Sequence, residues 1–203
     1  MKIKNDISSI EIDNDPFTLF EKWYKEHLAT GSAISDSVNL GTASSSGVVS
    51  VRTVLLKGFD EKGFVFYTNY NSKKGSQLLS NQKAALLFYW SESGRQVRIE
   101  GSVKKVSEKE SALYFQTRPR ESQLSAWASE QSSVIPDRQH LENCYELYQN
   151  KFYNQPVEKP PYWGGFRVIP EWFEFWQNGE FRLHDRFSYT LQKETWLIER
   201  LAP

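Results

Sequence analysis

From residue 38 onward, short apolar segments alternate with tight turns, and this spacing constrains the fold more than any other feature of the sequence. The segments are rich in β-branched and aromatic residues, and polar turns such as residues 44–47 and 60–63 separate them. We expect strands at residues 40–43, 48–57, 64–69, 84–90 and 96–106. Strands that are this short and this close in sequence are typical of an antiparallel barrel or sandwich.

Helical patterns occur before these strands and in one block after them. Asp15 followed by Pro16 is typical of an N-cap and a first helical position, and apolar residues then recur at helical spacing. After residue 106, a capping-box sequence at 107–110 begins a helix that Pro119 interrupts. We expect further helices at residues 121–129 and 137–152.

The chain returns to strand patterns after this helical block. Asn178-Gly179 is the strongest short hairpin signal in the sequence, and we expect it to join strands at 172–177 and 180–190. Further strands are expected at 163–168 and 195–201. Strands on both sides of a helical block predict an α+β domain that is mostly β, a barrel with peripheral helices. No linker divides the chain, so we expect a loose arm at residues 1–14 and a single domain at 15–203.

Composition excludes several classes of protein. The 25 basic and 25 acidic residues balance, which argues against a general nucleic-acid or membrane-surface binder. Cys144 is the only cysteine, so neither an intrachain disulfide nor a cysteine-based zinc site is possible, and we expect no metal. The N-terminal segment has no hydrophobic core of the kind found in signal peptides, and the longest apolar run is too short to cross a bilayer. We therefore expect a soluble, cytoplasmic protein.

The most informative cluster of polar residues lies in the expected strand after Asn178-Gly179. Because side chains alternate along a strand, Arg182, His184 and Arg186 would share one face. Phe181, Leu183 and Phe187 would form a core-facing side opposite them. Two guanidinium groups beside an imidazole cannot be half-buried without anions to pair with. A basic ladder on the surface explains the same pattern equally well.

Three other clusters could bind anions. Lys73 and Lys74 lie at the start of an expected helix, where free backbone N–H groups favour a phosphate, although a capped helix with solvated lysines is the simpler explanation. Arg52 and Lys57 bracket an apolar strand, either at a sheet edge or facing a ligand.

The last of these clusters is Tyr114, Arg118 and Ser122, spaced at i, i+4 and i+8, a set suited to phosphate but also compatible with a surface helix end. Together the clusters supply more cations than one phosphate needs. We therefore expect two phosphate sites, one for a cofactor and one for a substrate. No glycine-rich dinucleotide or Walker-type loop occurs in the sequence.

These clusters, in this order, resemble the pyridoxine/pyridoxamine 5′-phosphate oxidase family of FMN enzymes. The segments that carry the resemblance run from residue 52 to the C-terminus: RTVLLKGFDEKGFVFYTN, SKKGSQ, RQVRIEG, YFQTRPRESQLSAW, SEQSS, WGGFRV, FWQNGEFRLHDRF and RLAP. The resemblance implies a Greek-key split barrel that binds FMN at each end of a homodimer interface. It also implies oxidation of pyridoxamine or pyridoxine 5′-phosphate at C4′ to pyridoxal 5′-phosphate, with O₂ reduced to H₂O₂.

The resemblance also assigns residues to the cofactor and the substrate. The residues implied to contact FMN, some of them from the second subunit, are Arg52, Thr53, Val54, Leu55, Leu56, Lys57, Tyr67, Thr68, Lys73, Lys74, Gln96, Gln131, Ser132, Trp176 and Arg186. Those implied to hold the substrate phosphate are Lys57, Tyr114, Arg118 and Ser122. Arg182 and His184 would lie over the pyridine ring as the catalytic pair, with His184 bonding the ring's polar substituents or assisting proton removal.

One position departs from the family pattern, and two other functions remain open. Lys73 stands where the family often has Arg; it keeps the charge but loses the bidentate geometry, so we expect a modest effect on FMN affinity.

A phenazine-pathway oxidase of the same barrel need not keep the substrate-phosphate residues. A flavin- or heme-binding barrel that stores or senses its ligand would produce no peroxide.

Overall fold

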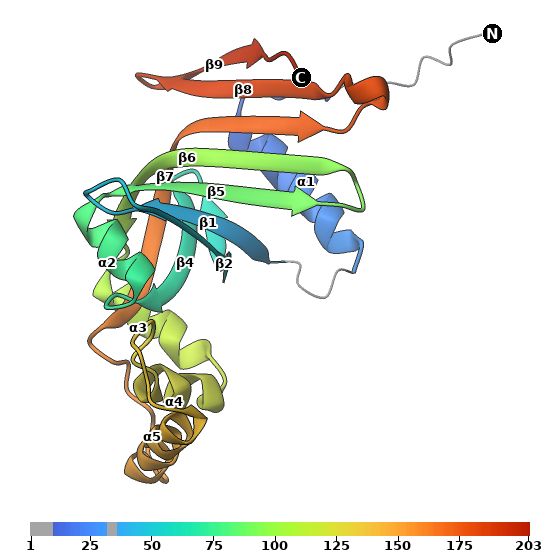
Figure 1. Cartoon of the computed structure of the whole chain (residues 1–203). Coiled ribbons are helices and arrows are strands. Elements are labelled where there is room, and N and C mark those ends of the chain that lie inside the picture. The colour runs from blue at the N-terminus through green and yellow to red at the C-terminus, as the bar shows by residue number, and fades with distance from the viewer. Residues whose placement is uncertain (1–9, 32–35) are drawn as a thin grey trace, which may run out of the picture.

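The computed structural model describes residues 10–31 and 36–203, which form a curled antiparallel sheet with helices packed around it (Figure 1). The strands are β1 (Ser37–Ala43), β2 (Val49–Leu55), β3 (Gly58–Asp60), β4 (Gly63–Asn69), β5 (Lys83–Trp90), β6 (Arg95–Lys105), β7 (Trp163–Gln177), β8 (Asp185–Gln192) and β9 (Thr195–Arg200). The helices are α1 (Pro16–Ala29), α2 (Lys73–Ser80), α3 (Glu108–Thr117), α4 (Arg120–Ala128) and α5 (Arg138–Lys151).

Within the described residues, nine strands form one sheet in the order β2-β1-β5-β6-β7-β4-β3, with β8 pairing with β7 and β9 with β8. All the pairings are antiparallel, and the sheet curls into a half-barrel. The mostly-β split barrel with peripheral helices that the sequence predicted is therefore confirmed. The helical block α3–α5 is inserted in the connection between the neighbouring strands β6 and β7, and β7 then pairs on its other side with β4.

Helix α1 covers the inside of the sheet and fills the core. Asp15 caps it through bonds from the Phe17 and Thr18 amides, as the sequence predicted. Leu19, Phe20 and Trp23 from this helix are buried, and the Phe20 ring lies 4.9 Å from those of both Phe64 and Phe88. Truncating one such ring would cost about 3–5 kcal/mol.

The helices α3 to α5 form a separate cluster below the sheet in Figure 1. Ser107 caps α3, and Pro119 separates α3 from α4, as expected. Their shared core contains Phe115, Leu124, Phe152, Val157 and Trp163. Trp163 begins β7, so this small core joins the helices to the sheet. The cleft between the two is where polar side chains collect.

One long strand replaces the two that were expected at 163–168 and 172–177. Strand β7 continues past Pro170, which lies opposite Gly101 where the β6–β7 register shifts. Proline has no N–H to donate to the ladder, but a bulge tolerates it. Gly101 makes the close approach possible, since a Cβ there would lie 2.0 Å from the Ile169 carbonyl oxygen.

The expected tight hairpin at Asn178-Gly179 is wrong in detail. Strands β7 and β8 do pair, but β8 begins only at Asp185. Residues 178–184 form a loop that contains a 3₁₀ turn at Glu180–Arg182. Gly179 has a φ of −127°, so it does not supply the positive φ that a type I′ turn requires.

The predicted alternation along this segment fails as a result. Phe181 and Leu183 are 89% and 59% exposed instead of facing the core, and Phe181 and Arg182 have positive φ values of 54° and 63°. Arg182 and His184 therefore lie on a loop and not on a strand. Phe187, inside β8, is buried as predicted.

Candidate functional site

A cavity of about 780 Å³ opens between strands β2 and β4 and helices α2 to α4. Its volume is in the range that binds small organic ligands. Of the residues predicted to contact FMN, it is lined by Arg52, Thr53, Val54, Leu55, Lys57, Tyr67, Thr68, Lys74 and Gln131. All four residues predicted to hold the substrate phosphate, Lys57, Tyr114, Arg118 and Ser122, line the same cavity.

Lys74 is the buried cation at the back of this cavity. It lies in the first turn of α2, which Ser72 caps by accepting a bond from the Gly75 N–H. Its Nζ donates to Thr68 Oγ1 and Gln131 Oε1, each at 3.1 Å, and no carboxylate pairs with it among the described residues. Burial, and secondly the charge of Arg52, lower the pKa of Lys74 to about 8. An anion in the cavity would restore its usual affinity for the proton.

Arg52 is oriented from the neighbouring strand. Its Nη1 donates to Thr42 Oγ1 at 2.6 Å and to the Leu40 carbonyl at 3.1 Å, both on β1. Burial lowers the pKa of Arg52. Lys57, at the end of β2, forms an ion pair with Asp36. Lys57 is thus the one cavity cation with a carboxylate partner in the described part of the chain, whereas Arg52 and Lys74 are held only by neutral groups.

Arg118 lines the cavity, and one nitrogen of its guanidinium lacks a hydrogen-bond partner in the described part of the chain. Its guanidinium lies over the Trp163 ring, 4.8 Å from the centroid, and burial lowers its pKa. Its Nη1 is buried and has no hydrogen-bond partner within the part of the chain that the structure describes. A buried donor without a partner costs about 1–3 kcal/mol, which marks Arg118 as a cation held in place at a cost in stability.

Aromatic rings form the wall beside Arg118. Tyr67 and Tyr114 stack at 4.0 Å, and Trp163 lies nearly parallel to both. Burial raises the pKa of Tyr67 to about 12, so its hydroxyl stays protonated as a donor. Sequence reasoning missed Trp163, since a core tryptophan and a tryptophan in a site wall give the same pattern.

The helical register predicted for the phosphate residues is not observed. Arg118 and Pro119 lie between α3 and α4, so Tyr114, Arg118 and Ser122 do not form one continuous stripe. Pro119 cannot donate an N–H, and the chain turns there. The bend still brings all three side chains to the same cavity.

A second group of predicted residues lies elsewhere on the sheet. Trp176 of β7 is opposite Gln96 on β6 and Arg186 on β8, and its ring lies 4.6 Å from that of His184. Arg186 donates to Glu174 at 2.8 Å and to the Ala202 carbonyl at 2.6 Å. Strand β8 and the helices α3 and α4 occupy opposite ends of the molecule in Figure 1.

Within a single chain, the predicted residues therefore fall into two groups, those that line the cavity and those that do not. Those that do not line the cavity are Leu56, Lys73, Gln96, Ser132, Trp176, Arg182, His184 and Arg186. Leu56 is buried in the main core, and Lys73 is exposed on the first turn of α2.

The cavity residues suit a phosphorylated planar cofactor such as FMN. Cations held only by neutral groups line a space walled partly by aromatic rings, and one lining residue, Arg118, has a buried guanidinium nitrogen without a partner in the described part of the chain. No cluster of three or more potential metal ligands occurs among the described residues. Within the same residues, no helix is long and apolar enough to cross a membrane. The cytoplasmic location expected from the sequence stays a prediction.

Comparison with known families agrees with these features. A family model described as pyridoxamine 5′-phosphate oxidase matches residues 25–149. A second, described as the pyridoxine 5′-phosphate oxidase C-terminal dimerisation region, matches residues 163–203.

Individual proteins match over nearly the whole chain. A pyridoxine/pyridoxamine 5′-phosphate oxidase of Trichormus variabilis is 48% identical over 97% of this chain and 92% of its own length. The enzyme of the same name from a Nostoc species is 50% identical over the same shares. The crystal structure of PhzG from Burkholderia lata, in complex with tetrahydrophenazine-1-carboxylic acid, matches with a TM-score of 0.90 and 28% identity, covering 95% of both chains. An FMN-binding protein from Nostoc punctiforme, 17% identical with a TM-score of 0.74, covers 95% of this chain and all of its own and shares the fold.

Proposed function

This chain belongs to the pyridoxamine 5′-phosphate oxidase family, and on that premise we propose that it oxidises pyridoxamine and pyridoxine 5′-phosphates to pyridoxal 5′-phosphate, with FMN as cofactor and O₂ as acceptor. The observation that carries the proposal is the arrangement of cations in one cavity. Lys74 and Arg52 line the cavity from α2 and β2, and Arg118 lines it from the junction of α3 and α4, each without a carboxylate partner among the described residues. That arrangement suits two phosphates, one on the cofactor and one on the substrate.

Each residue would contribute binding or orientation. Lys74 and Arg52 would neutralise the cofactor phosphate, helped by the free N–H groups in the first turn of α2. Arg118, with the hydroxyls of Tyr114 and Ser122, would hold the substrate phosphate and so fix the position of C4′. Arg182 would stabilise charge that develops at the substrate ring, and His184 would bond the ring's polar substituents.

The reaction balances with O₂ as the electron acceptor and, for the amine, with water as a second reactant. The alcohol loses two electrons and two protons at C4′ and gives the aldehyde directly. The amine also loses two electrons and two protons, and this gives an imine. Water then hydrolyses the imine to the aldehyde and ammonia. Bound FMN would supply the redox chemistry, namely acceptance of hydride from C4′ and reduction of O₂ to H₂O₂.

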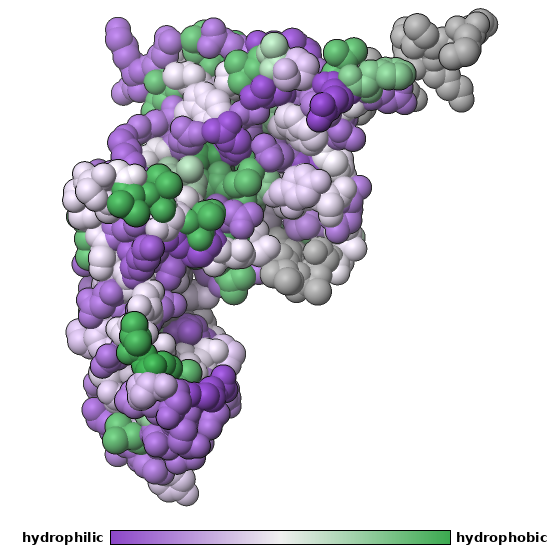
Figure 2. All heavy atoms as spheres, viewed as in Figure 1, coloured by the Kyte–Doolittle hydropathy of each residue, from purple (hydrophilic) through white to green (hydrophobic). Residues whose placement is uncertain are grey.

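We also propose that the protein works as a homodimer. The outer face of the sheet carries exposed apolar side chains, among them Val49, Val51 and Tyr89, at 78%, 74% and 61% exposure. Figure 2 shows hydrophobic side chains gathered over this sheet. A second copy on this face would bury them and bring the Arg182–His184 loop of one subunit to the cavity of the other. The match of residues 163–203 to a dimerisation region supports this proposal.

A phenazine-type oxidase is the second candidate, because PhzG shares the fold at a TM-score of 0.90. The two functions differ in whether the substrate carries a phosphate. The set of Tyr114, Arg118 and Ser122 around one cavity favours the phosphorylated substrate.

Anaerobic mixing tests the proposal. The FMN-loaded protein is mixed without oxygen with pyridoxamine 5′-phosphate, and in a parallel sample with unphosphorylated pyridoxamine. We expect the phosphate ester to bleach the flavin absorbance, the unphosphorylated compound to do so far more slowly, and air to restore the colour. A flavin that neither compound bleaches would exclude the proposed function.

A further inference from the structure

The loop that carries Arg182 and His184 contains a backbone-to-imidazole hydrogen bond. The Gly179 N–H donates to His184 Nδ1 at 3.2 Å. Two residues in left-handed conformation, Phe181 and Arg182, turn the chain back so that this contact forms. The Leu183 N–H closes the turn on the Glu180 carbonyl at 2.9 Å. Left-handed conformations in residues other than glycine are uncommon and concentrate at functional sites.

This bond determines which ring nitrogen carries the proton. Because Nδ1 accepts the Gly179 N–H, the proton of the neutral imidazole is on Nε2. Nε2 is then a donor with no lone pair to offer. Acting as a base at Nε2 would need the opposite tautomer, in which Nδ1–H and the Gly179 N–H would be two donors facing each other.

Glycine is required at position 179 by space. A Cβ there would lie 2.2 Å from the Leu183 carbonyl oxygen and 2.9 Å from its carbon. Both atoms belong to the backbone, so the loop itself would have to move. Since Gly179 has a negative φ, the requirement comes from this close approach and not from backbone conformation.

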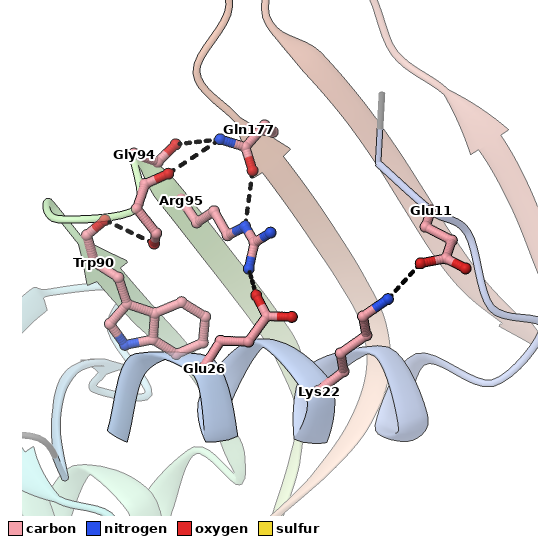
Figure 3. A network of polar contacts seen from close by, with 8 residues as sticks. Glu11, Lys22, Glu26, Trp90, Gly94, Arg95 and Gln177 are labelled. Atoms are coloured by element: carbon pink, nitrogen blue, oxygen red, sulfur yellow. Dashed lines mark hydrogen bonds and ion pairs between the residues drawn. The ribbon is translucent and has the colours of Figure 1, made fainter. Parts of the chain in front are cut away.

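The base of the loop is held by a hydrogen-bond network that reaches α1 (Figure 3). The Asn178 N–H donates to the Gly94 carbonyl at 2.8 Å, and Gln177 Nε2 donates to the Ser93 carbonyl at 3.1 Å. Arg95 Nε donates to Gln177 Oε1 at 2.8 Å, and Arg95 also pairs with Glu26 of α1. The loop therefore starts from a fixed point next to the Trp176 ring.

We propose that the Gly179 amide is a positioning group that keeps His184 in the tautomer that donates through Nε2. Building on the proposed function, His184 then donates a hydrogen bond to an acceptor oxygen on the substrate ring and does not remove a proton from the substrate. Arg182, on the same loop, adds a positive charge. His184 and Arg182 thus both offer hydrogen-bond donors, which suits an anionic ring oxygen beside the reacting carbon.

Two substitutions of His184 separate the donor role from a base role. The amide nitrogen of Gln reaches about where Nε2 lies, whereas the side chain of Asn reaches only as far as Nδ1. We expect His184→Gln to retain kcat within about tenfold and His184→Asn to lose about 100-fold, the cost of a lost hydrogen bond to a charged group. A His184→Gln variant as inactive as His184→Asn, in an enzyme whose wild type turns over, would overturn the donor role.

Gly179→Ala tests the positioning role, with Gly58→Ala as the matched control because no atom lies within 4 Å of a Cβ there. We expect Gly179→Ala to bind FMN normally and to lower kcat about tenfold, and Gly58→Ala to leave kcat unchanged. An unchanged kcat in Gly179→Ala would contradict the proposal.

Nitrogen-15 NMR of the imidazole provides a readout that does not depend on turnover. The His184 signals are identified by their loss in His184→Gln. An unprotonated Nδ1 in wild-type protein supports the proposal, and a protonated Nδ1 overturns it. If the wild type shows no turnover, the proposed function fails, while this spectrum still decides the tautomer.

Discussion

At the scale of single residues, we expect Lys74 to make cofactor binding depend on pH. Its pKa is lowered to about 8 in the absence of an anion, and a bound phosphate would raise it again. Binding above pH 8 therefore requires uptake of a proton, so we expect the Kd for FMN to rise with pH, by up to about tenfold per pH unit. Fluorescence titrations between pH 7 and 9.5 measure this slope.

Two variants serve as controls for that slope. Lys74→Met should bind FMN at least about tenfold more weakly and lose the pH dependence in this window. Lys73→Met changes the exposed neighbour and should keep the dependence, because Lys74 remains. A wild-type Kd that does not change across this range would contradict the role given to Lys74.

We expect Arg182 to act in the chemical step and not in cofactor binding. It is exposed in the single chain and lies outside the cavity. We expect Arg182→Leu to remain yellow with FMN but to lose at least about 100-fold in kcat, the usual cost of removing one group that stabilises the transition state. Single-turnover flavin reduction measures the chemical step. Wild-type rates in this variant would remove Arg182 from the mechanism.

At the scale of elements, we expect the network between α1 and the β5–β6 turn to determine how firmly the loop of residues 178–184 is held. Arg95 lies over Trp23 at 4.5 Å, bonds Gln177 and pairs with Glu26. Arg95→Met keeps the apolar cover but removes the polar contacts. We expect it to lower the free energy of unfolding by about 1–2 kcal/mol and kcat by about 2- to 10-fold, with FMN affinity unchanged.

Lys22 is the matched control in the same helix. It pairs with Glu11 near the network in Figure 3, but both side chains are exposed. Exposed pairs contribute little to stability, so Lys22→Met should change neither denaturant midpoint nor kcat measurably. Equal effects of the two substitutions would mean that the network does not act on the loop.

Most of the helices and strands, but not all, could be predicted from the sequence. Period-two patterning, turn residues and helix caps predicted nearly every strand and helix, because local preferences and burial agree there. Asn178-Gly179 predicted a two-residue hairpin turn, but the chain forms a longer loop there, in which Gly179 contacts His184. Pro170 led us to expect two strands where β7 is continuous, because the bulge at Gly101 that accommodates this proline lies on another strand. Pairwise tertiary contacts of this kind are not encoded in one segment.

At the scale of the whole molecule, the sequence offered a list of candidate site residues, but it did not show which of them lie together within one chain. The cavity collects one group of these residues, while Gln96, Trp176, His184 and Arg186 lie at another part of the sheet. No spacing along the chain distinguishes contacts made within a subunit from contacts made by its partner. The proposed dimer accounts for the division.

A charge on the outer face of the sheet tests the proposed dimer. Val51 is 74% exposed in the single chain, and Val51→Glu would place a carboxylate in the interface. We expect the wild type to have twice the mass of one chain by light scattering. The variant should be monomeric and bind FMN at least about tenfold more weakly, because an unpaired buried charge is costly.

Leu147→Glu, on α5 and 60% exposed, is the control for this substitution and should remain dimeric. A wild type that is monomeric with FMN bound would contradict the proposed assembly.

In the proposed function, this cavity and the loop of residues 178–184 together oxidise a phosphorylated B6 vitamer. The most direct measurement follows pyridoxal 5′-phosphate and H₂O₂ together when FMN-loaded protein meets pyridoxamine 5′-phosphate in air. The proposed function predicts one aldehyde and one peroxide for each O₂ consumed, and a strongly raised KM in Arg118→Met, because that variant loses a guanidinium that lines the cavity. Protein that binds FMN but forms neither product would contradict it.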